Sequence, residues 1–433
     1  MPETSLSRFS IGVGDRFAHQ ARAQLQACIQ AFQAGVLVMP VWNKSNREHT
    51  IIGSEPAQTR AAADTAVKEL DWGQPYFCDA DHISLKTVDR FLEPCDFFTI
   101  DVADQIGVAA SRAEMEAFIR RHADLVGWIE LPGIAEPLRV THEDLERVSQ
   151  KYLAAASQAT ETYRHIERAK GRGKFLTEVS MDETDVPQTP AELLLILAAL
   201  ADRGVPLVTV APKFTGRFNK GVDYVGDAAV FARELEEDMA VVRYAVSAFG
   251  LPAELKLSLH SGSDKFSIYG AVHNAMTKMN AGLHLKTAGT TWLEEMIGLA
   301  EAGGDALALV KDIYVEAYAD REELCAPYAA VIDIEVARLP LPEVAQRWTA
   351  EQWVGALRHD LQSPEYNSSL RQLMHVGFKI AAKMGSRYTA MLERHEGVVA
   401  ENVTRNLLDR HIRPVFLGAG APSATNRREA ARR

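Results

Sequence analysis

The chain has 433 residues, 47% of them hydrophobic and 24% charged, which supplies apolar sequence for a large buried core and exceeds the length of most single domains. Its 47 Lys and Arg residues against 58 Asp and Glu residues give a net charge of −11, which excludes nucleic acid and anionic membrane surfaces as expected partners. No stretch approaches the roughly 20 apolar residues of a membrane span, and the first residues lack a signal-peptide pattern, so we expect a cytoplasmic protein.

Short runs of β-branched and aromatic residues recur along the first 300 residues and predict eight strands. The predicted strands are 9–14, 36–41, 76–79, 97–102, 175–179, 207–211, 255–259 and 283–286. Helical stretches, such as 18–33 and 227–249, separate most of them. Alternating strands and helices predict a parallel sheet that closes into a TIM (β/α)8 barrel of the α/β class.

The spacing of these elements also predicts how the chain is divided. We expect a catalytic barrel over residues 1–305, with a helical insertion at about 105–172 between the fourth and fifth strands. Residues 306–417 form a predicted helical extension packed on the barrel; helices are expected at 294–302, 306–319 and 370–393, with no further convincing strand. Residues 418–433, rich in Gly, Ala, Ser and Arg, are predicted to be a disordered tail.

The cysteines give no sign of a disulfide framework. Cys28, Cys78, Cys95 and Cys325 lie far apart and form no CxxC pair. This pattern also argues against a thiolate zinc site, so we expect reduced structural thiols.

Polar residues gather where the predicted strands end. The groups are 14–17 (GDRF), 42–47 (WNKSNR), 79–82 (DADH), 178–182 (EVSMD), 213–227 (KFTGRFNKGVDYVGD), 260–265 (HSGSDK) and 284–289 (HLKTAG). One such group is most often a solvated loop or a helix cap. Seven groups at seven strand ends exceed what capping requires, and the active sites of TIM barrels lie at this edge.

Two histidines in these groups are the strongest candidate metal ligands. His82 and His260 each follow an apolar strand and have a carboxylate or small polar residue as a neighbour. A catalytic ion usually has a third protein ligand, for which we select Asp223, with Glu178 and His284 as competitors. Such a set accepts Zn, Mn, Ni, Co or Fe.

Basic residues in the same groups suit a substrate with a carboxylate. Lys213, Arg217 and Lys220 follow the sixth strand, and only one or two of these side chains need hold the anion. Asp15 and Arg16 are equally compatible with an internal ion pair. The residues expected to bind substrate are Asp15, Arg16, Asn43, Lys44, Lys213, Arg217, Ser261, Lys265, His284 and Lys286. Neither a phosphate-binding loop nor a dinucleotide fingerprint is present, so no nicotinamide cofactor is expected.

Long strings that include these residues resemble the tagaturonate epimerase family, which interconverts tagaturonate and fructuronate. The strings are GDRF (14–17), VWNKSNREH (41–49), DADHISLKTVDRF (79–91), DFFTIDVAD (96–104), EVSMDET (178–184), KFTGRFNKGVDYVGD (213–227), LHSGSDKFSIY (259–269), HLKTAGTTWLEE (284–295), RHD (358–360), RQLMHVGFK (371–379) and VTRNLLDRH (403–411). The resemblance covers almost the whole chain except the extreme C-terminal tail.

The family is similar in turn to class II metal-dependent aldolases. The matching positions here are Asp81-His82, Glu178, Asp223 and the turn that begins at His260. Asp223 stands where the aldolases use histidine, which leaves the third ligand open between the candidates above. Lys265 lies near the turn that aldolases use for a phosphate, which is consistent with a carboxylate substrate.

The resemblance implies a metal-dependent epimerase that interconverts D-tagaturonate and D-fructuronate in hexuronate catabolism. The two compounds differ at a carbinol carbon two bonds from the ketone carbon, where the hydrogen is not acidic. We therefore expect retro-aldol cleavage, rotation of the aldehyde and re-addition, with a divalent ion stabilising the enediolate. Asp81 and Glu178 are the expected acid–base pair, with Asp81 ionised and Glu178 raised in pKa so that it can donate a proton.

Other functions on the same barrel are a class II-type aldolase and a ketose 3-epimerase that acts on a sugar acid. A sugar-acid sensor would need no acid–base pair, so the joint presence of Asp81, Glu178 and two histidines disfavours it. The expected partner is a small keto-hexuronate, and the sequence leaves a homo-oligomer open.

Overall fold

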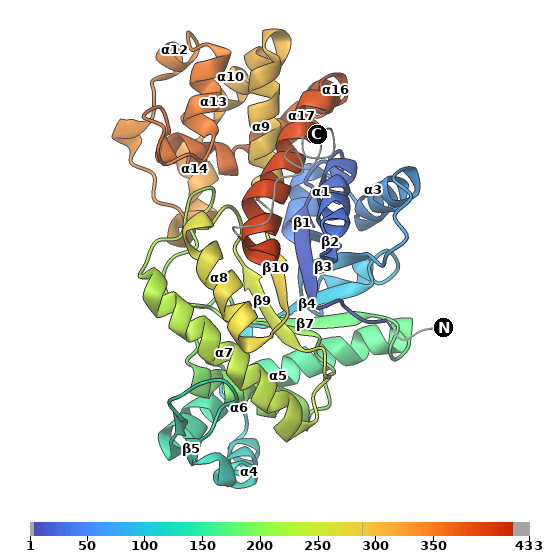
Figure 1. Ribbon diagram of the computed structural model, residues 1–433, viewed down its shortest axis with the longest axis vertical. Coiled ribbons are helices and arrows are strands. Elements are labelled where there is room, and N and C mark those ends of the chain that lie inside the picture. Colours follow the sequence, from blue (N-terminus) through green and yellow to red (C-terminus); the bar gives the residue numbers. More distant parts are fainter. Residues whose placement is uncertain (1–3, 288, 419–433) are drawn as a thin grey trace, which may run out of the picture.

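Eight parallel strands form a closed barrel at the centre of the computed structural model, which describes residues 4–287 and 289–418 (Figure 1). Around the barrel the strands follow the order β1, β10, β9, β8, β7, β4, β3, β2. Their bounds are β1 Phe9–Gly14, β2 Val38–Ser45, β3 Phe77–Ile83, β4 Phe97–Asp101, β7 Leu176–Ser180, β8 Thr209–Ala211, β9 Lys256–His260 and β10 Leu283–Lys286. The predicted TIM barrel is confirmed.

All eight predicted strands are present, and their ends differ from prediction mainly where polar residues begin. Strands β2 and β3 extend through Ser45 and Ile83, so that residues predicted to lie in loops belong to the sheet. The register of β2 and β3 pairs Asn43 with Asp79 and Ser45 with Asp81. Polar side chains at a barrel mouth can remain in strands because the neighbouring strands satisfy their backbone groups.

Helices surround the barrel in the usual alternation. They are α1 Ala21–Gln33, α2 Asn46–Ile52, α3 Pro56–Glu69, α5 His142–Lys170, α6 Pro190–Asp202, α7 Ala228–Phe249 and α8 Phe266–Met279, with the short helix η1 Val88–Phe91 after β3. The last place in the ring is taken by η6, Asn406–Leu417, a wide π-type helix that packs between α8 and α1. Thus the end of the chain completes the outer layer of the barrel.

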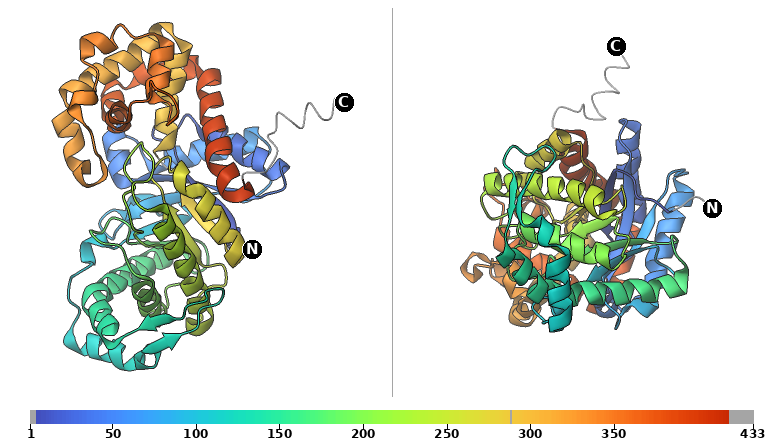
Figure 2. Two further views of the ribbon diagram at one scale, coloured as in Figure 1. Left: turned by 60° about the vertical axis from the view of Figure 1, so that its left-hand side comes forward. Right: turned by 90° about the horizontal axis from the view of Figure 1, so that it is seen from below.

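The predicted insertion lies between β4 and β7 and contains η2 Ala103–Gln105, α4 Arg112–Arg121 and η3 Ala123–Leu125 ahead of α5. It also contains a two-stranded antiparallel sheet of β5, Gly127–Ile129, and β6, Leu138–Val140. These strands were not predicted, because three residues are too few to show an alternating pattern. The segment lies at the end of the molecule away from the helical extension (Figure 2).

A second group of helices begins after β10. Its elements are α9 Thr290–Ala302, α10 Gly304–Ala319, α11 Arg321–Cys325, η4 Ala326–Val331, η5 Val336–Arg338, α12 Pro342–Ala345, α13 Ala350–Leu357, α14 Ser368–Val376, α15 Phe378–Met384, α16 Ser386–Arg394 and α17 Glu396–Arg405. The helix predicted at 370–393 is three helices, broken at Gly377 and at Gly385, whose φ of 54° strongly favours glycine. We call α9 to α17 the helical extension.

The extension has its own core but is anchored to the barrel. Its apolar residues cluster around Trp292, Trp353 and Tyr388, whereas Leu407, Ile412 and the rest of η6 pack with the barrel core. The predicted tail falls outside the described residues except for Gly418. Across the described part of the chain, no helix is both long and apolar enough to span a membrane.

Candidate active site

A β-bulge in β3 brings two neighbouring side chains to the mouth of the barrel. In a regular strand Asp81 and His82 would point to opposite faces. The register of β3 against β4 shifts between Ala80 and Ile83, and His82 has a φ of 49°, in the left-handed region. Bulges re-aim side chains next to active sites, and here the bulge lets both residues face the site.

Strand β7 contributes every second residue to the same region. Glu178 is fully buried within the barrel, and Ser180 follows on the same face. Asp182 lies two residues beyond Ser180, just past the strand end, and accepts a hydrogen bond from the Ser180 hydroxyl. The period of two therefore places the Asp182 carboxylate above Glu178, at the carboxyl edge of the barrel.

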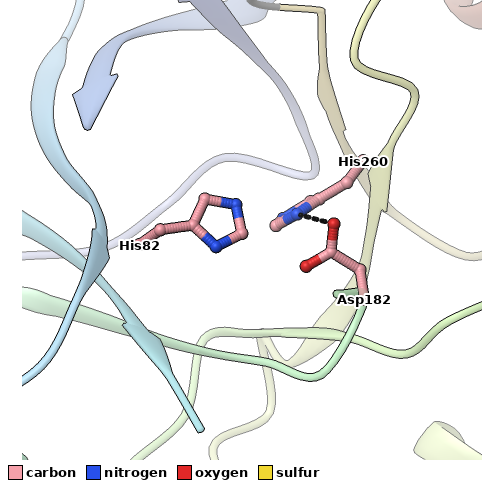
Figure 3. A group of neighbouring side chains, drawn as sticks. All are labelled: His82, Asp182 and His260. Atoms are coloured by element: carbon pink, nitrogen blue, oxygen red, sulfur yellow. Dashed lines mark ion pairs between the residues drawn. The ribbon is translucent and has the colours of Figure 1, made fainter. Parts of the chain in front are cut away.

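His82, Asp182 and His260 form a group that can hold a metal ion (Figure 3). One ligand atom from each residue lies within 4.8 Å of those of the other two. Nδ1 of His260 is 3.1 Å from a carboxylate oxygen of Asp182, and the two imidazole rings are 5.4 Å apart at their centres. The side chains come from β3, β9 and the end of β7, so the barrel closure alone assembles them.

Further carboxylates orient both histidines. Nδ1 of His82 lies 2.9 Å from Asp101, and Nε2 of His260 lies 2.8 Å from Glu178. Carboxylates that hold the second ring nitrogen are typical of histidine ligands. Burial would lower the pKa of each imidazole, but nearby carboxylates raise it, to about 9 for His260 and well above its usual value for His82. The site therefore has a strongly negative potential, and its donor set fits a divalent cation.

A buried lysine lies beneath this group. The ammonium of Lys286 is 2.8 Å from Asp79, 2.9 Å from Asp81 and 3.0 Å from Glu178. It also donates to the hydroxyl of Thr99, whose single proton has Asp79 at 2.9 Å and Glu178 at 3.2 Å as alternative acceptors. One cation thus shares three carboxylates, an arrangement that needs close hydrogen bonding to offset the cost of burial.

The charges of this cluster set the protonation of its members. Burial alone would raise the pKa of Asp81 and Glu178, but Lys286 and the histidines hold both below their usual range. The pKa of Asp79 is raised to about 7 by burial, against the effect of Lys286. The ionised state expected for Asp81 agrees with these directions. The raised pKa expected for Glu178 was wrong, because Lys286 and His260 stabilise its carboxylate.

Two candidates for the third metal ligand lie elsewhere. Among the described residues, Asp223 belongs to no group with the two histidines; its carboxylate instead accepts hydrogen bonds from the backbone and hydroxyl of Ser267 at the start of α8. His284 faces the barrel interior, with Nδ1 2.9 Å from the hydroxyl of Ser10. Burial lowers its pKa to about 3. The structure brings Asp182 to the histidines in their place.

Several predicted substrate-binding residues are engaged by the protein itself. The carboxylate of Asp15 accepts backbone N–H bonds from His19 and Gln20 at the start of α1. The ammonium of Lys44 donates to the carbonyl of Arg16 and to a serine hydroxyl. Ser261 donates to the carbonyl of Lys286. These bonds support the barrel mouth but leave the side chains little capacity for a ligand.

The remaining predicted residues differ in their surroundings. The ammonium of Lys265 donates to the carbonyls of Asn219 and Val222, and that of Lys213 to a carbonyl of the loop after β7. Arg217 lies at the surface, 3.5 Å from Asp333. Asn43 is buried, and its side-chain oxygen has no hydrogen-bond partner among the described residues.

Arg16 pairs with Glu48 at 2.9 Å, so the internal ion pair considered with Asp15 does not form. One of its terminal nitrogens is buried without a partner in the described part of the chain.

Sequence reasoning missed several members of the site. Asp182 was in one of the strand-end groups but was not selected, although its spacing of four from Glu178 puts it on the same face of the strand. Asp101 ends β4, and Thr99 lies two residues before it on the inner face. Strand ends with a polar residue at every second position were the signal that could have found all three.

These observations define an α/β barrel whose histidines, carboxylates and buried lysine gather at the carboxyl ends of the strands. A model of the tagaturonate epimerase family matches residues 1–412. The chain belongs to the tagaturonate epimerase family, which makes it an isomerase and a carbohydrate epimerase, and the resemblance seen in its sequence is confirmed.

Individual relatives agree with this assignment. A tagaturonate/fructuronate epimerase from Thermotoga maritima is 27% identical over 422 residues, covering 94% of this chain and 80% of that protein. The crystal structure of a fructuronate-tagaturonate epimerase from Cohnella laeviribosi with one glycerol matches with a TM-score of 0.78 at 24% identity, over 94% of this chain and 81% of that chain. Its native structure matches with a TM-score of 0.77 at 23% identity, over 96% and 82%. The two structures show that the fold is shared.

Proposed function

We propose that this protein interconverts D-tagaturonate and D-fructuronate in the cytoplasm, with a divalent cation as cofactor. The observation that carries the proposal is the group of His82, Asp182 and His260, which lies directly above the cluster of carboxylates around Lys286. Ligands for a cation and groups that can move a proton thus share one barrel mouth. The names of the relatives from Thermotoga maritima and Cohnella laeviribosi support the choice of substrate.

The proposed chemistry breaks and remakes one carbon–carbon bond. A base takes the proton of the hydroxyl on the carbinol carbon, the bond to the carbon next to the ketone breaks, and its electron pair moves to the ketone oxygen. This leaves an aldehyde that carries the carboxylate and a three-carbon enediolate. The aldehyde turns, the enediolate adds to its other face, and the proton returns to the new alkoxide. Atoms and electrons balance without an oxidant.

His82, Asp182 and His260 would hold the cation, with Asp101 and Glu178 fixing the orientation of the two rings. When bound, a divalent ion at such a site supplies Lewis-acid stabilisation of negative charge on the ketone oxygen. Zn, Mn, Ni, Co and Fe all suit these ligands.

Asp81 is the proposed base. Its carboxylate is held ionised, touches Lys286 and lies one residue from the ligand His82. Glu178 was the expected acid, but its pKa is held well below its usual value, and its two oxygens contact Thr99, Thr209, His260 and Lys286. We therefore assign Glu178 to positioning His260. We propose that Lys286, whose ammonium lies 2.9 Å from Asp81, gives a proton to the new alkoxide and takes up the proton that Asp81 removed, so that both groups return to their starting state.

The test is proton NMR of D-fructuronate incubated with chelator-stripped protein, with and without Mn²⁺, Ni²⁺ or Zn²⁺. We expect D-tagaturonate to appear only with added metal. Asp81→Asn should lower turnover by about 10²–10⁴-fold, the usual contribution of a general base, with unchanged metal content. Near-normal turnover by this variant would remove Asp81 from the mechanism.

Running the reaction in D2O separates the related functions. Retro-aldol epimerisation conserves the six-carbon chain and leaves the hydrogen next to the ketone unexchanged. A ketose 3-epimerase would introduce deuterium at that carbon, and an aldolase would release three-carbon products. Either result would contradict the proposed reaction but would leave the assignment of the barrel and of the metal-binding group unchanged.

A further inference from the structure

The loop after β8 is held rigidly on both sides of Lys220. The ammonium of Lys265 donates to the carbonyls of Asn219 and Val222, and the backbone N–H of Gly221 donates to the hydroxyl of Ser263. From the helical extension, Arg371 donates to the carbonyl of Gly221, and the N–H of Lys220 itself donates to Val331 at the end of η4. The barrel and the extension thus fix this segment, and the position of Lys220 is set in advance of any ligand.

The side chain of Lys220 is charged, half-buried and without a carboxylate partner. Among the described residues, no Asp or Glu oxygen lies within 4.0 Å of its ammonium. Instead it faces the ring of Tyr328, on η4, at 5.2 Å. Arg47 and Lys379 face the same ring at 5.5 and 4.9 Å, and neither has an ion-pair partner in the part of the chain that the structure describes. We call Arg47, Lys220, Lys379 and Tyr328 the cation cluster.

Arg16 adds a fourth positive charge beside this cluster. Its guanidinium lies 4.2 Å from the centre of the Phe378 ring, next to Lys379 in the sequence, and pairs with Glu48 on one side. A terminal nitrogen of Arg16 is buried with no hydrogen-bond partner among the described residues, although the side chain is only 8% exposed. A buried N–H without a partner costs free energy unless a ligand accepts a hydrogen bond from it.

The cation cluster and the proposed metal site have a carboxylate neighbour in common, Glu183. Glu183 lies in a second group with His82 and Asp101, with ligand atoms within 4.8 Å of one another. The charge of Glu183 also acts on Lys220: burial and then Arg47 lower the pKa of this lysine, and Glu183 raises it. Four cations around Tyr328 and Phe378 face the carboxylates of Glu48, Glu183 and Glu323, which leaves one positive charge in excess in a protein whose net charge is −11.

We propose that Lys220, with Arg16, Arg47 and Lys379 around it, binds the carboxylate of the sugar acid, while the histidine group binds the keto end. This inference rests on the proposed function for the identity of the substrate. The site requires both parts of the fold, since Tyr328 and Lys379 come from the helical extension. Arg16 and Lys220 come from loops of the barrel, and Arg47 comes from α2. The extension would then select acids over neutral sugars.

The test compares an acid with its neutral counterpart in binding as well as in turnover. Calorimetry of the metal-loaded protein with D-gluconate and D-glucitol gives the preference for a carboxylate without requiring a reaction. Lys220→Met keeps the length of the side chain and removes its charge. Lys220→Arg keeps the charge, and Lys68→Met on the exposed face of α3 is the matched control.

We expect Lys220→Met to weaken gluconate binding by about 10- to 100-fold, the usual contribution of a charge-assisted hydrogen bond, and to leave glucitol binding unchanged. KM for D-fructuronate should rise by a similar factor with a smaller change in kcat, and Lys220→Arg should restore most of both. Lys68→Met should behave as the unmodified protein.

Three outcomes would overturn the proposal: unmodified protein that binds gluconate no better than glucitol, a Lys220→Met variant that keeps its preference for gluconate, or an equal loss for both ligands together with a lower melting temperature. Failure of the proposed function is a separate result. In that case no hexuronate would be epimerised, although the preference for gluconate would still depend on Lys220.

Discussion

At the scale of single residues, His82 shows how backbone conformation serves the site. A φ of 49° is uncommon for residues other than glycine and costs free energy, and it occurs here within a bulge. Without the bulge, Asp81 and His82 could not both face the barrel mouth. The strain therefore lies where one strand supplies two functional side chains in succession.

The identity of the third ligand leads to the first prediction. Asp182→Asn removes a charge from the group with His82 and His260, so we expect the dissociation constant of the metal to rise by more than about tenfold. Asp223→Asn should leave metal affinity unchanged, because the Asp223 carboxylate bonds to Ser267 instead. Competition with a fluorescent chelator measures both constants. The reverse pattern, with only Asp223→Asn weakening the metal, would restore the ligand selected from the sequence.

The sequence predicted the residues that stand alone at strand ends and missed those that depend on geometry. His82 and His260 were selected because histidine after an apolar strand is chemically conspicuous, and the barrel brings the two side chains together. Asp182 was not selected. Lys220 was considered with Lys213 and Arg217 but was left out of the expected substrate-binding residues, since lysine is common in loops and the sequence does not show which side chains lack partners. The pKa of Glu178 was misjudged because it depends on neighbours, here Lys286 and His260, that only the closed barrel brings together.

At the scale of secondary-structure elements, Asp264 ties the barrel to the helical extension. Its buried carboxylate lies 2.8 Å from Arg371 on α14 and 3.3 Å from His359, and it accepts a hydrogen bond from Thr290 at the start of α9. His411 of η6 lies 3.4 Å away. One carboxylate thus joins the loop after β9 to four segments of the chain after β10.

Asp264→Asn should therefore be strongly destabilising. The change leaves Arg371 buried without its counter-charge, which typically costs about 3–5 kcal/mol in the free energy of unfolding. Asp320→Asn, which affects the exposed pair with Lys383, should cost less than about 0.5 kcal/mol. Urea denaturation of the three proteins measures both differences. Equal stability of the Asp264 variant and the unmodified protein would show that the buried pair does not join the two parts.

The buried pair of Asp264 and Arg371 also makes the stability of the protein depend on pH. Burial would raise the pKa of Asp264, but Arg371 and the hydrogen bonds of His359 and His411 hold it well below its usual value. A carboxyl whose pKa is lower in the folded state stabilises the protein fully above its unfolded pKa of about 3.9, and this contribution is lost as the pH falls through the folded pKa. The difference in the free energy of unfolding between Asp264→Asn and the unmodified protein should thus be constant above about pH 5 and decrease below about pH 4.

Elements with a strong local signal were predicted well. Strands β1 and β10 have the predicted bounds, because their apolar runs end in clear turn or polar signals. The long helix at 370–393 was predicted from apolar periodicity that continues through Gly377 and Gly385, whereas the chain breaks there to form α14, α15 and α16. Where a helix breaks depends on its tertiary contacts, which periodicity does not report.

At the scale of the whole molecule, the chain closes its barrel with its last helix. β10 is followed by the complete helical extension, and only then does η6 return to pack between α8 and α1. The barrel therefore depends on a segment about 120 residues away from its last strand along the chain. Such a connection was not predictable from sequence, because nothing in the apolar pattern of η6 shows which neighbour it packs against.

This arrangement predicts that the barrel cannot fold without η6. A chain ending at Arg405 loses the buried side chains of Leu407, Leu408, Ile412, Val415 and Phe416, each of which contributes about 1.5–3 kcal/mol when buried. Their combined contribution is comparable to the total stability of about 5–15 kcal/mol that a typical protein has. We therefore expect the shortened chain to show no cooperative thermal transition by circular dichroism.

A chain ending at Gly418 is the matched control, since it keeps every contact described above. It should melt within a few degrees of the complete chain and retain its metal affinity. If the chain ending at Arg405 also melted cooperatively and bound metal, the barrel would close without its eighth outer helix, and η6 would be an addition to the fold. If both shortened chains failed, residues after 418 would themselves be required for folding. The closing role belongs to η6 only if the chain ending at Gly418 melts cooperatively and the chain ending at Arg405 does not.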